Sequence, residues 1–363
     1  MLEQIGIPVA KCHNMESSVK SMQPTEAEAT SQLCSSNSGA ETKRQDLLHR
    51  FTSTPYATDL RLMQRTVRLE TNRSAVLARS LDFFERHQDG RAAKPDFLWR
   101  IVCEPDCRVE SIAVQLSAFS DLGLRYVNVG QRGFLAVDLE RREAMGALAD
   151  LFVEGEPSLR YNRPFDILFC MTAPSLGLTA LSGGCVGVDD RGVVVFGPPN
   201  SGKTTACYLA AKQGMEFHAD QALFLDMSCN ALRAWGDLFP AVFRPETLDF
   251  LPELRLSARR SANGDLSFYY FDKRALQARQ AQPVVPVCSL FMERGISCEP
   301  QLREISQEDA LSRLRDCVLF NEDTRFDTQI SAALKALAEQ PVYCLRYGGS
   351  PKIAATFIEK LLA

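Results

Sequence analysis

The sequence lacks an excess of positive charge. Its 363 residues include 41 Lys and Arg against 45 Asp and Glu, which gives a formal net charge of -4, and it contains no long run of basic residues. A chain with this charge has no overall attraction to a polyanion. Nucleic acids and anionic membrane surfaces are therefore not expected partners.

Long apolar runs and paired metal-binding cysteines are also missing. No uninterrupted apolar stretch reaches the roughly 20 residues that span a bilayer, and the N-terminal "MLEQIGIPVAKCHN" has no basic head before an apolar core. The twelve Cys are scattered, and the closest pair, Cys103 and Cys107, has no second pair at zinc-site spacing. We expect free thiols, no membrane segment and a cytoplasmic location.

The composition is that of an ordinary globular protein, with 45% hydrophobic and 24% charged residues. Its length predicts two folded domains. Residues 1–55 are expected to be a disordered tail, because 15–46 are rich in Ser, Thr, Glu and Gln. A small α/β domain is expected over 56–155, and a nucleotide-binding domain over 160–363. The polar segment 154–164, which contains Pro and Gly, marks the boundary.

Hydrophobic periodicity predicts the elements of both domains. In the first domain a helix capped by Asn72 is expected over 72–87, together with strands at 65–71, 97–104, 123–130 and 133–140, the last two forming a hairpin. In the second domain, residues 165–188 begin as a helix and close in a short strand. Further strands are expected at 192–196, 215–220, 222–226, 231–236, 285–293 and 342–349, with helices at 203–214, 306–320, 327–340 and 350–363. No internal repeat is apparent.

One segment carries a specific chemical signal. The stretch "GPPNSGKT", residues 197–204, fits the pattern G-x-x-x-x-G-K-[ST], and it lies between a predicted strand and a predicted helix. The residues that would bind a nucleotide are Gly197, Pro198, Pro199, Asn200, Ser201, Gly202, Lys203, Thr204 and Thr205. The alternative is a strand–helix turn that contains this pattern by chance.

Each residue type in the motif has a physical task. The amides of about Ser201 to Thr205 would point at phosphate from the positive end of a helix. Lys203 would reach the β- and γ-phosphates, and the Thr204 hydroxyl would bind Mg²⁺. The motif therefore predicts ATP and Mg²⁺ as cofactors.

An acidic residue is needed to complete a metal site or to act as a base. Asp220 follows one helix and one strand after Lys203, and Asp226 ends the next strand. We favour Asp220 as catalytic residue and metal ligand, because Asp226 leads into a hairpin turn, where Asp is common. Either carboxylate could instead cap a turn.

The order of these motifs resembles HPr kinase/phosphorylase and the related small kinases that share a fold with ATP-type phosphoenolpyruvate carboxykinase. The matching residues are "GPPNSGKTT" (197–205) and "HADQALFLD" (218–226). The resemblance covers roughly 160–363, with a looser similarity over 60–155. It implies an α/β fold with a mixed sheet and a P-loop domain of HPr kinase-like type, preceded by a small α/β domain.

The sequence departs from this family at two positions. Gln221 stands where the family's second acid usually lies, and Ser182 occupies the place of a histidine near the end of the preceding helix. A neutral amide does not supply the charge of a carboxylate at Mg²⁺. His218 could substitute for that histidine, if a regular strand places it on the same face as Asp220. A buried structural role is the alternative.

These observations favour an ATP- and Mg²⁺-dependent kinase that transfers a phosphoryl group to a hydroxyl. The phosphoacceptor, a protein serine or a small molecule, is left open, and a homo-oligomer is an open alternative to a monomer. A second hypothesis, motivated by Gln221 and Ser182, is a catalytically weak nucleotide sensor that regulates a partner. A third, an NTPase without acceptor, ranks last because no distant Walker B strand stands out.

Overall fold

A computed structural model describes most of the chain beyond the N-terminal segment. The described residues are 52–86, 94–104, 117–121, 123–128, 133–149, 164–228, 231–236, 241–257, 259–263, 266–271, 282–295, 299–320 and 323–363. The expected tail up to residue 51 and the expected boundary at 154–163 lie outside them. Among the helices of the described part, none has the length and apolar character that crossing a membrane requires.

The first half of the chain forms a mixed sheet of eight strands in the order β3-β1-β2-β4-β8-β7-β6-β5. Neighbouring strands are parallel from β2 to β4 and from β4 to β8, and antiparallel elsewhere. Its elements are β1 (Tyr56–Leu62), β2 (Arg65–Thr71), helix α1 (Ser74–Phe83), β3 (Glu85–Arg86), β4 (Phe97–Glu104), β5 (Ser117–Asp121), β6 (Leu124–Asn128), β7 (Gly133–Asp138) and β8 (Glu143–Ala149). The strands predicted at 65–71 and 97–104 and the β6–β7 hairpin are confirmed.

The predicted cap of the first helix is wrong. Arg73, not Asn72, is the N-cap residue of α1, and no side chain caps the helix. Asn72 instead contacts β4: its Nδ2 donates to the Cys103 carbonyl at 2.9 Å, and its Oδ1 accepts from the Cys103 amide at 2.8 Å. The Asn72 side chain thus satisfies the backbone amide and carbonyl of one residue in β4. A capping rule considers only neighbours in sequence, so it cannot predict this contact.

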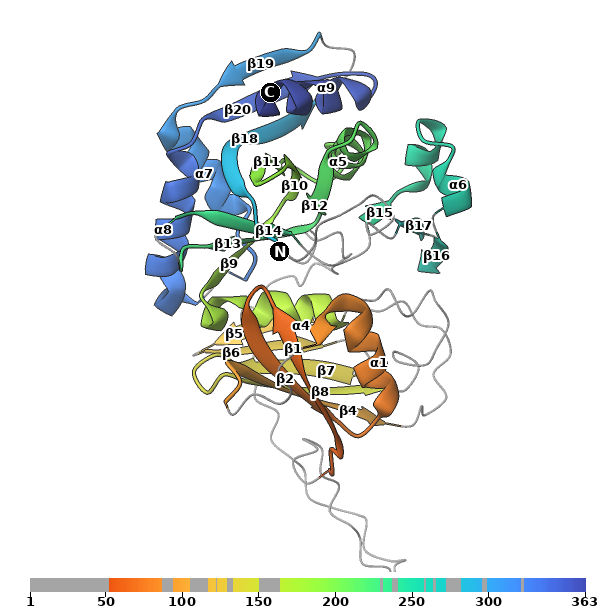
Figure 1. Cartoon of the computed structure of the whole chain (residues 1–363), viewed down its shortest axis with the longest axis vertical. Helices are drawn as coiled ribbons and strands as arrows, with labels where there is room; N and C mark the ends of the chain where they lie inside the picture. Colours follow the sequence, from red (N-terminus) through yellow and green to blue (C-terminus); the bar gives the residue numbers. More distant parts are fainter. Residues whose placement is uncertain are drawn as a thin grey trace, which may run out of the picture.

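The second half is built on a sheet of six strands, in the order β12-β10-β11-β18-β20-β19. These are β10 (Gly184–Val188), β11 (Arg191–Phe196), β12 (Glu216–Ala219), β18 (Val285–Arg294), β19 (Gln301–Glu304) and β20 (Val342–Tyr347). Because β11, β18 and β20 are parallel, their carboxyl ends share one edge. Helices α5 (Lys203–Lys212) and α9 (Lys352–Leu362) cover one face, and α7 (Gln307–Asp316) and α8 (Asp327–Ala338) cover the other (Figure 1).

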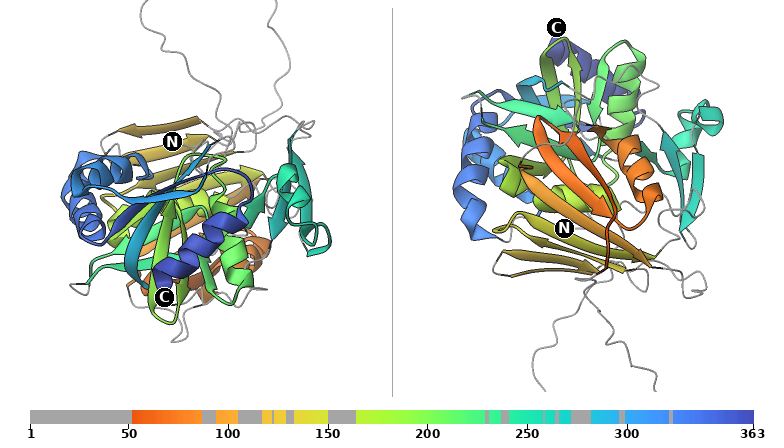
Figure 2. Two further views of the ribbon diagram at one scale, coloured as in Figure 1. Left: turned by 90° about the horizontal axis from the view of Figure 1, so that it is seen from above. Right: turned by 60° about the horizontal axis from the view of Figure 1, so that its bottom comes forward.

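Two small sheets complete the structure. One has the order β14-β13-β9 and the other β15-β17-β16. The latter sheet and α6 stand out at the side of the molecule (Figure 2). Their elements are β9 (Leu178–Ser182), β13 (Ala222–Asp226), β14 (Arg233–Gly236), β15 (Ala241–Phe243), α6 (Leu254–Ser257), β16 (Arg259–Asn263) and β17 (Leu266–Phe271). Helix α4 (Pro164–Thr172) and the 3-10 helix η3 (Ala173–Leu176) precede β9, the 3-10 helix η4 (Pro245–Asp249) lies between β15 and α6, and the 3-10 helix η6 (Thr324–Phe326) lies between α7 and α8.

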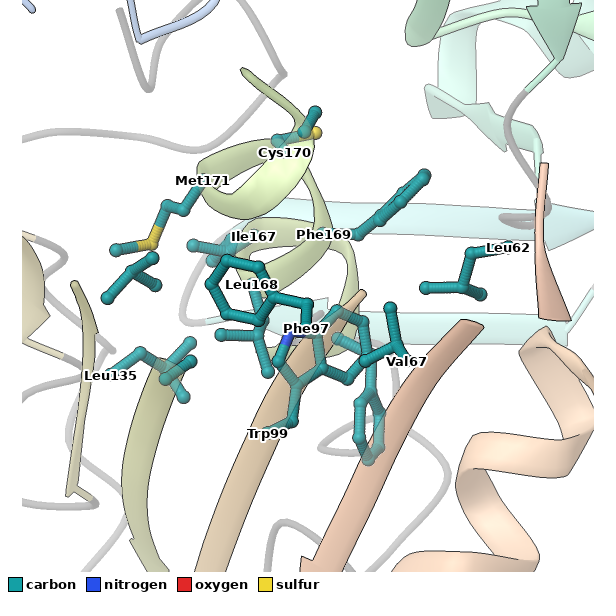
Figure 3. Packing of buried hydrophobic residues seen from close by; sticks show 14 of the residues in the cluster. Leu62, Val67, Phe97, Trp99, Leu135, Ile167, Leu168, Phe169, Cys170 and Met171 are labelled. Atoms are coloured by element: carbon teal, nitrogen blue, oxygen red, sulfur yellow. The ribbon is translucent and has the colours of Figure 1, made fainter. Parts of the chain in front are cut away.

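One apolar cluster crosses from the first sheet to the elements after it. Trp99 of β4 and Leu135 of β7 are buried in the same cluster as Phe169 of α4 and Phe224 of β13. Figure 3 shows α4 lying over the strands of the eight-stranded sheet, with Leu168 and Met171 on the side of the sheet and Cys170 on the opposite side of the helix. The first sheet therefore buries its inner face against α4 and β13 as well as against its own helix α1.

Candidate functional site

The loop 197–202 leaves the buried strand β11 at the carboxyl edge of the six-stranded sheet and enters α5. Its two motif glycines, Gly197 and Gly202, have φ values of 146° and 91°. A Cβ atom would lie 2.6 Å from the Met292 carbonyl oxygen at Gly197, and 2.6 Å from Tyr347 Oη at Gly202. Only glycine fits both the backbone conformation and the space.

The first turn of α5 has neither a capping side chain nor an acidic residue. Its N-cap is Gly202, and the helix begins at Lys203. The first amides of a helix have no intrahelical acceptor, and they carry the positive end of the helix dipole. This end of α5 can therefore bind an anion.

Lys203 folds back over the loop. Its ammonium Nζ donates to the Gly197 carbonyl at 2.7 Å and to the Pro198 carbonyl at 3.1 Å. Burial lowers the pKa of Lys203, while the nearby Cys317, Cys207 and Asp220 act in the opposite direction. The cation is thus held at the loop and lies within electrostatic range of the predicted acid.

Ser201 places a hydroxyl inside the loop. The side chain is 2% exposed, and within the described part of the chain Oγ has no hydrogen-bond partner. An ideal Cβ at Gly197 would lie 2.8 Å from this Oγ, so the hydroxyl faces the start of the loop. A buried hydroxyl without a partner is costly, and a polar ligand would satisfy it.

The remaining motif residues differ in exposure. Pro198, Pro199 and Asn200 form the exposed rim of the loop, and Asn200 has a positive φ of 67°. Thr204 is half-buried and Thr205 is buried in the first turn of α5. Thr204 is therefore the more exposed of the two threonines at the start of the helix.

Asp220 lies directly after β12 and is 2% exposed. The Gly183 amide donates to the Gln221 carbonyl at 3.2 Å, and Ser182 pairs with Ala222 across β9 and β13. The structure thus brings Ser182 together with the Asp220–Gln221 turn. Ser182 ends a strand, β9, so its expected place near a helix end is wrong.

The segment after α7 also reaches this place, and sequence reasoning missed it. The Ser182 amide donates to the Cys317 carbonyl at 2.7 Å, and Cys317 acts electrostatically on Lys203. Burial raises the pKa of the Cys317 thiol to about 12, against an opposing effect of Lys203. The thiol stays protonated at neutral pH. No motif in the sequence marks this residue.

Asp226 has a structural role. Its carboxylate accepts from Arg65 Nη1 at 2.6 Å and Nη2 at 3.0 Å, and from Trp235 Nε1 at 3.3 Å. Burial would raise the pKa of Asp226, but hydrogen bonds from Arg65 and Ser228 outweigh burial and lower it to about 2. This ion pair links β13 to β2 of the first sheet.

His218 does not share a regular strand face with Asp220. Cys185 pairs with Ala219 and Val186 with Phe217, so His218 is the extra residue of a β-bulge. It is buried, with Nε2 3.4 Å from Glu216 Oε2. It also lies beside Gly187, which pairs with Gly192 at the end of β11 opposite the loop. Its surroundings fit a structural histidine.

Two predicted ligands of a magnesium ion lie in one region of the structure: Thr204 follows Lys203, and Asp220 acts electrostatically on Lys203. In the described ranges, no three His, Cys, Asp or Glu side chains gather as a metal site of their own. Mg²⁺ needs few protein ligands when phosphate oxygens and waters supply the rest. Thr204 and Asp220 would be those ligands.

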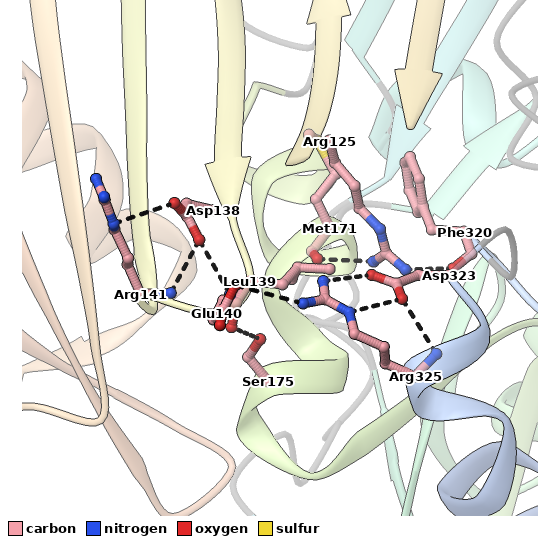
Figure 4. Close-up of polar contacts among 10 residues, drawn as sticks. All are labelled: Arg125, Asp138, Leu139, Glu140, Arg141, Met171, Ser175, Phe320, Asp323 and Arg325. Carbon is pink, nitrogen blue, oxygen red and sulfur yellow. Dashed lines mark hydrogen bonds and ion pairs between the residues drawn. The ribbon is translucent and has the colours of Figure 1, made fainter. Parts of the chain in front are cut away.

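A polar cluster joins the first sheet to the segment that follows Cys317. Arg125 of β6 is buried, and it donates to the Met171 carbonyl at 2.8 Å and to the Phe320 carbonyl. Arg325 donates to Asp323 at 2.8 Å. Figure 4 shows these groups side by side. The segment that reaches Lys203 is therefore anchored on the eight-stranded sheet.

Comparison with solved structures finds an HPr(Ser) kinase/phosphatase from Coxiella burnetii. The match has 11% sequence identity and a TM-score of 0.27, and it covers 50% of this chain and 94% of that chain. At this TM-score the likeness assigns no fold, function or residue role to this chain. No known family profile and no curated protein sequence matches the chain.

Proposed function

We propose that the chain binds ATP with Mg²⁺ at residues 197–205 and transfers a phosphoryl group to a hydroxyl of a protein serine or a small molecule. One observation carries the proposal: the uncapped first turn of α5, the Lys203 ammonium and the unpartnered Ser201 hydroxyl meet at one loop. A positive helix end with a cation and a buried hydroxyl is suited to a phosphate chain.

The residues divide the chemistry among them. Lys203 and the loop amides neutralise charge that builds on the phosphate oxygens during transfer. When bound, Mg²⁺ supplies a further positive charge on the phosphates, held by Thr204 and Asp220. Asp220, buried and close to Lys203, orients the acceptor hydroxyl or takes its proton.

A second candidate function is a nucleotide sensor with little transfer activity. The amide of Gln221 follows Asp220 directly, and Ser182 lies against the same turn, where a kinase of this kind would hold a second acid and a histidine. Loss of members from a catalytic group that works as a unit lowers turnover by orders of magnitude, while nucleotide affinity is retained.

The test measures binding and transfer separately. We expect Lys203→Ala to weaken ATP–Mg²⁺ binding at least about tenfold in titration calorimetry, because it removes a charge-assisted contact to phosphate. We expect Asp220→Asn to keep affinity within about threefold and to reduce phosphoryl transfer about a hundredfold or more. Transfer is measured with radiolabelled ATP on a cell extract, which reports activity and acceptor together.

Two exposed residues provide matched controls. Lys212 ends the same helix as Lys203, and Asp190 lies in the turn before β11. Lys212→Ala and Asp190→Asn should leave binding and transfer unchanged. ATP binding without labelled product favours the sensor, and phosphate release without acceptor favours an NTPase. If the unaltered chain does not bind ATP–Mg²⁺, both proposed functions are wrong.

A further inference from the structure

Tyr347 contacts the loop from the far end of the chain. It is the last residue of β20, fully buried in the cluster that includes Val195 of β11 and Met292 of β18. Its hydroxyl donates to the Ser201 carbonyl at 2.7 Å. The same Oη would lie 2.6 Å from a Cβ atom placed on Gly202. One phenol therefore touches the loop at the peptide between Ser201 and Gly202.

This contact fixes the direction of a peptide plane. In a trans peptide the carbonyl and the following amide point in opposite directions, and the described residues include no cis peptide. Tyr347 holds the Ser201 carbonyl on the core side. The Gly202 amide must then point away from Tyr347 and the core.

We propose that Tyr347 is a positioning residue for the nucleotide: it orients the Ser201–Gly202 peptide so that the Gly202 amide faces the phosphates. The inference rests on the proposed binding of ATP at this loop. Tyr347 does not touch the ligand. It acts through the loop backbone, and it lies outside the G-x-x-x-x-G-K-[ST] motif.

Two further facts support this role. Burial raises the pKa of Tyr347 to about 12, against an opposing effect of Arg294, so the hydroxyl stays protonated and remains a donor at neutral pH. Without this donor, the buried Ser201 carbonyl would lose its partner, and the peptide could rotate to find another. The Gly202 amide would then leave its place in the loop.

The experiment compares two tyrosines of one strand. Tyr343 also lies on β20 and packs on the same apolar cluster at the opposite end of the strand. Tyr347→Phe keeps the ring and removes only the hydroxyl. We expect Tyr347→Phe to weaken binding of ATP–Mg²⁺ about three- to tenfold, and of inorganic tripolyphosphate by the same factor. Tyr343→Phe should leave both affinities unchanged.

Binding is measured by calorimetry well below the melting temperature, so that loss of folded protein does not contribute. Gly202→Ala provides a second variant, and its loss of affinity should be smaller in the Tyr347→Phe background, where the clash with the hydroxyl is absent. Equal affinity of Tyr347→Phe and the unaltered chain overturns the inference and leaves ATP binding intact. If the unaltered chain binds neither ATP–Mg²⁺ nor tripolyphosphate, the inference and the proposed function are both overturned. If Tyr347→Phe does not fold, the unaltered chain is tested by NMR: a Gly202 amide resonance that does not shift when inorganic tripolyphosphate binds overturns the inference.

Discussion

Asp220 and Asp226 are close in sequence, and each follows or ends a short strand, but their surroundings differ. Asp226 is paired with Arg65 and also accepts hydrogen bonds from the Ser228 amide and the Trp235 indole. Asp220 is buried near Lys203, at the edge of the sheet where the loop 197–202 begins. The preference for Asp220 came from its position in sequence. Its chemical role stays a proposal, whereas the ion pair of Asp226 gives that residue a structural role.

The Asp226 ion pair predicts a dependence of stability on pH. Its pKa is lowered from 3.8 to about 2, so its ionisation stabilises the folded chain above about pH 4. This contribution, about 2 kcal/mol, is lost as the pH falls toward 2. Asp226→Asn should destabilise the chain at pH 7 by about 2 to 4 kcal/mol, because it leaves Arg65 without its anion.

Urea unfolding at a series of pH values between 7 and 3 measures this effect. The free energy of unfolding of the unaltered chain should approach that of Asp226→Asn as the pH falls below 4. Asp190→Asn, in an exposed turn, should follow the unaltered chain throughout. A constant difference between Asp226→Asn and the unaltered chain down to pH 3 would contradict the lowered pKa.

At the scale of elements, the sequence predicted strands with clear alternation or an apolar run, and it missed others, including the aromatic-rich β17 and the strand β8, which is rich in small residues. Strands β2, β4 and β20 are found where alternation places them. Strand β8, "EAMGALA", has no β-branched residue and was not predicted. A Cβ at Gly146 would lie 2.8 Å from Ile101 Cδ1 and from Leu135 Cδ2, so its small residues fit neighbouring strands. Such tertiary demands are not visible in local propensity.

The candidate site shows the same limit. Lys203 and its loop are local in sequence, and the motif located them directly. The contacts of Ser182, Cys317 and Tyr347 join distant segments, and no spacing rule finds them. Residues 306–320 were expected to be one helix, but α7 ends at Asp316, and Leu319 then donates to the Ala180 carbonyl at 2.9 Å. The residues after Asp316 therefore pair with β9 and do not continue the helix.

Helix α7 is stabilised at its start by Ser306, whose side chain accepts from the Asp309 amide at 3.2 Å. Ser306→Ala should lower the free energy of unfolding by about 1 kcal/mol, because it removes an N-cap. Ser312→Ala, at an exposed position within the same helix, should be neutral or slightly stabilising, since Ala is the better helix former. Chemical denaturation of the two variants checks this, and equal effects would show that the cap contributes nothing.

At the scale of the whole molecule, the two halves of the chain are joined by more than the connecting segment. The cluster around Trp99 includes Phe169, Phe224 and Trp235, which come from the second half. The Arg65–Asp226 ion pair and the hydrogen bonds of buried Arg125 cross the same junction. The division into domains at 56–155 and 160–363 stays a prediction. The shared core implies that the stability of each half depends on the other.

A shared core predicts that the full chain unfolds in one cooperative transition, because opening either half exposes the apolar face of the other. Phe224→Ala, in the shared cluster, should lower the midpoint of that one transition, with a loss of about 3 to 5 kcal/mol. Differential scanning calorimetry should give a calorimetric enthalpy equal to the van't Hoff enthalpy. The fragment 160–363 should show no cooperative transition, since Phe169, Phe224 and Trp235 would face water. Two separate transitions in the full chain, or a fragment that melts cooperatively near the full chain's midpoint, would show instead that each half is stable by itself.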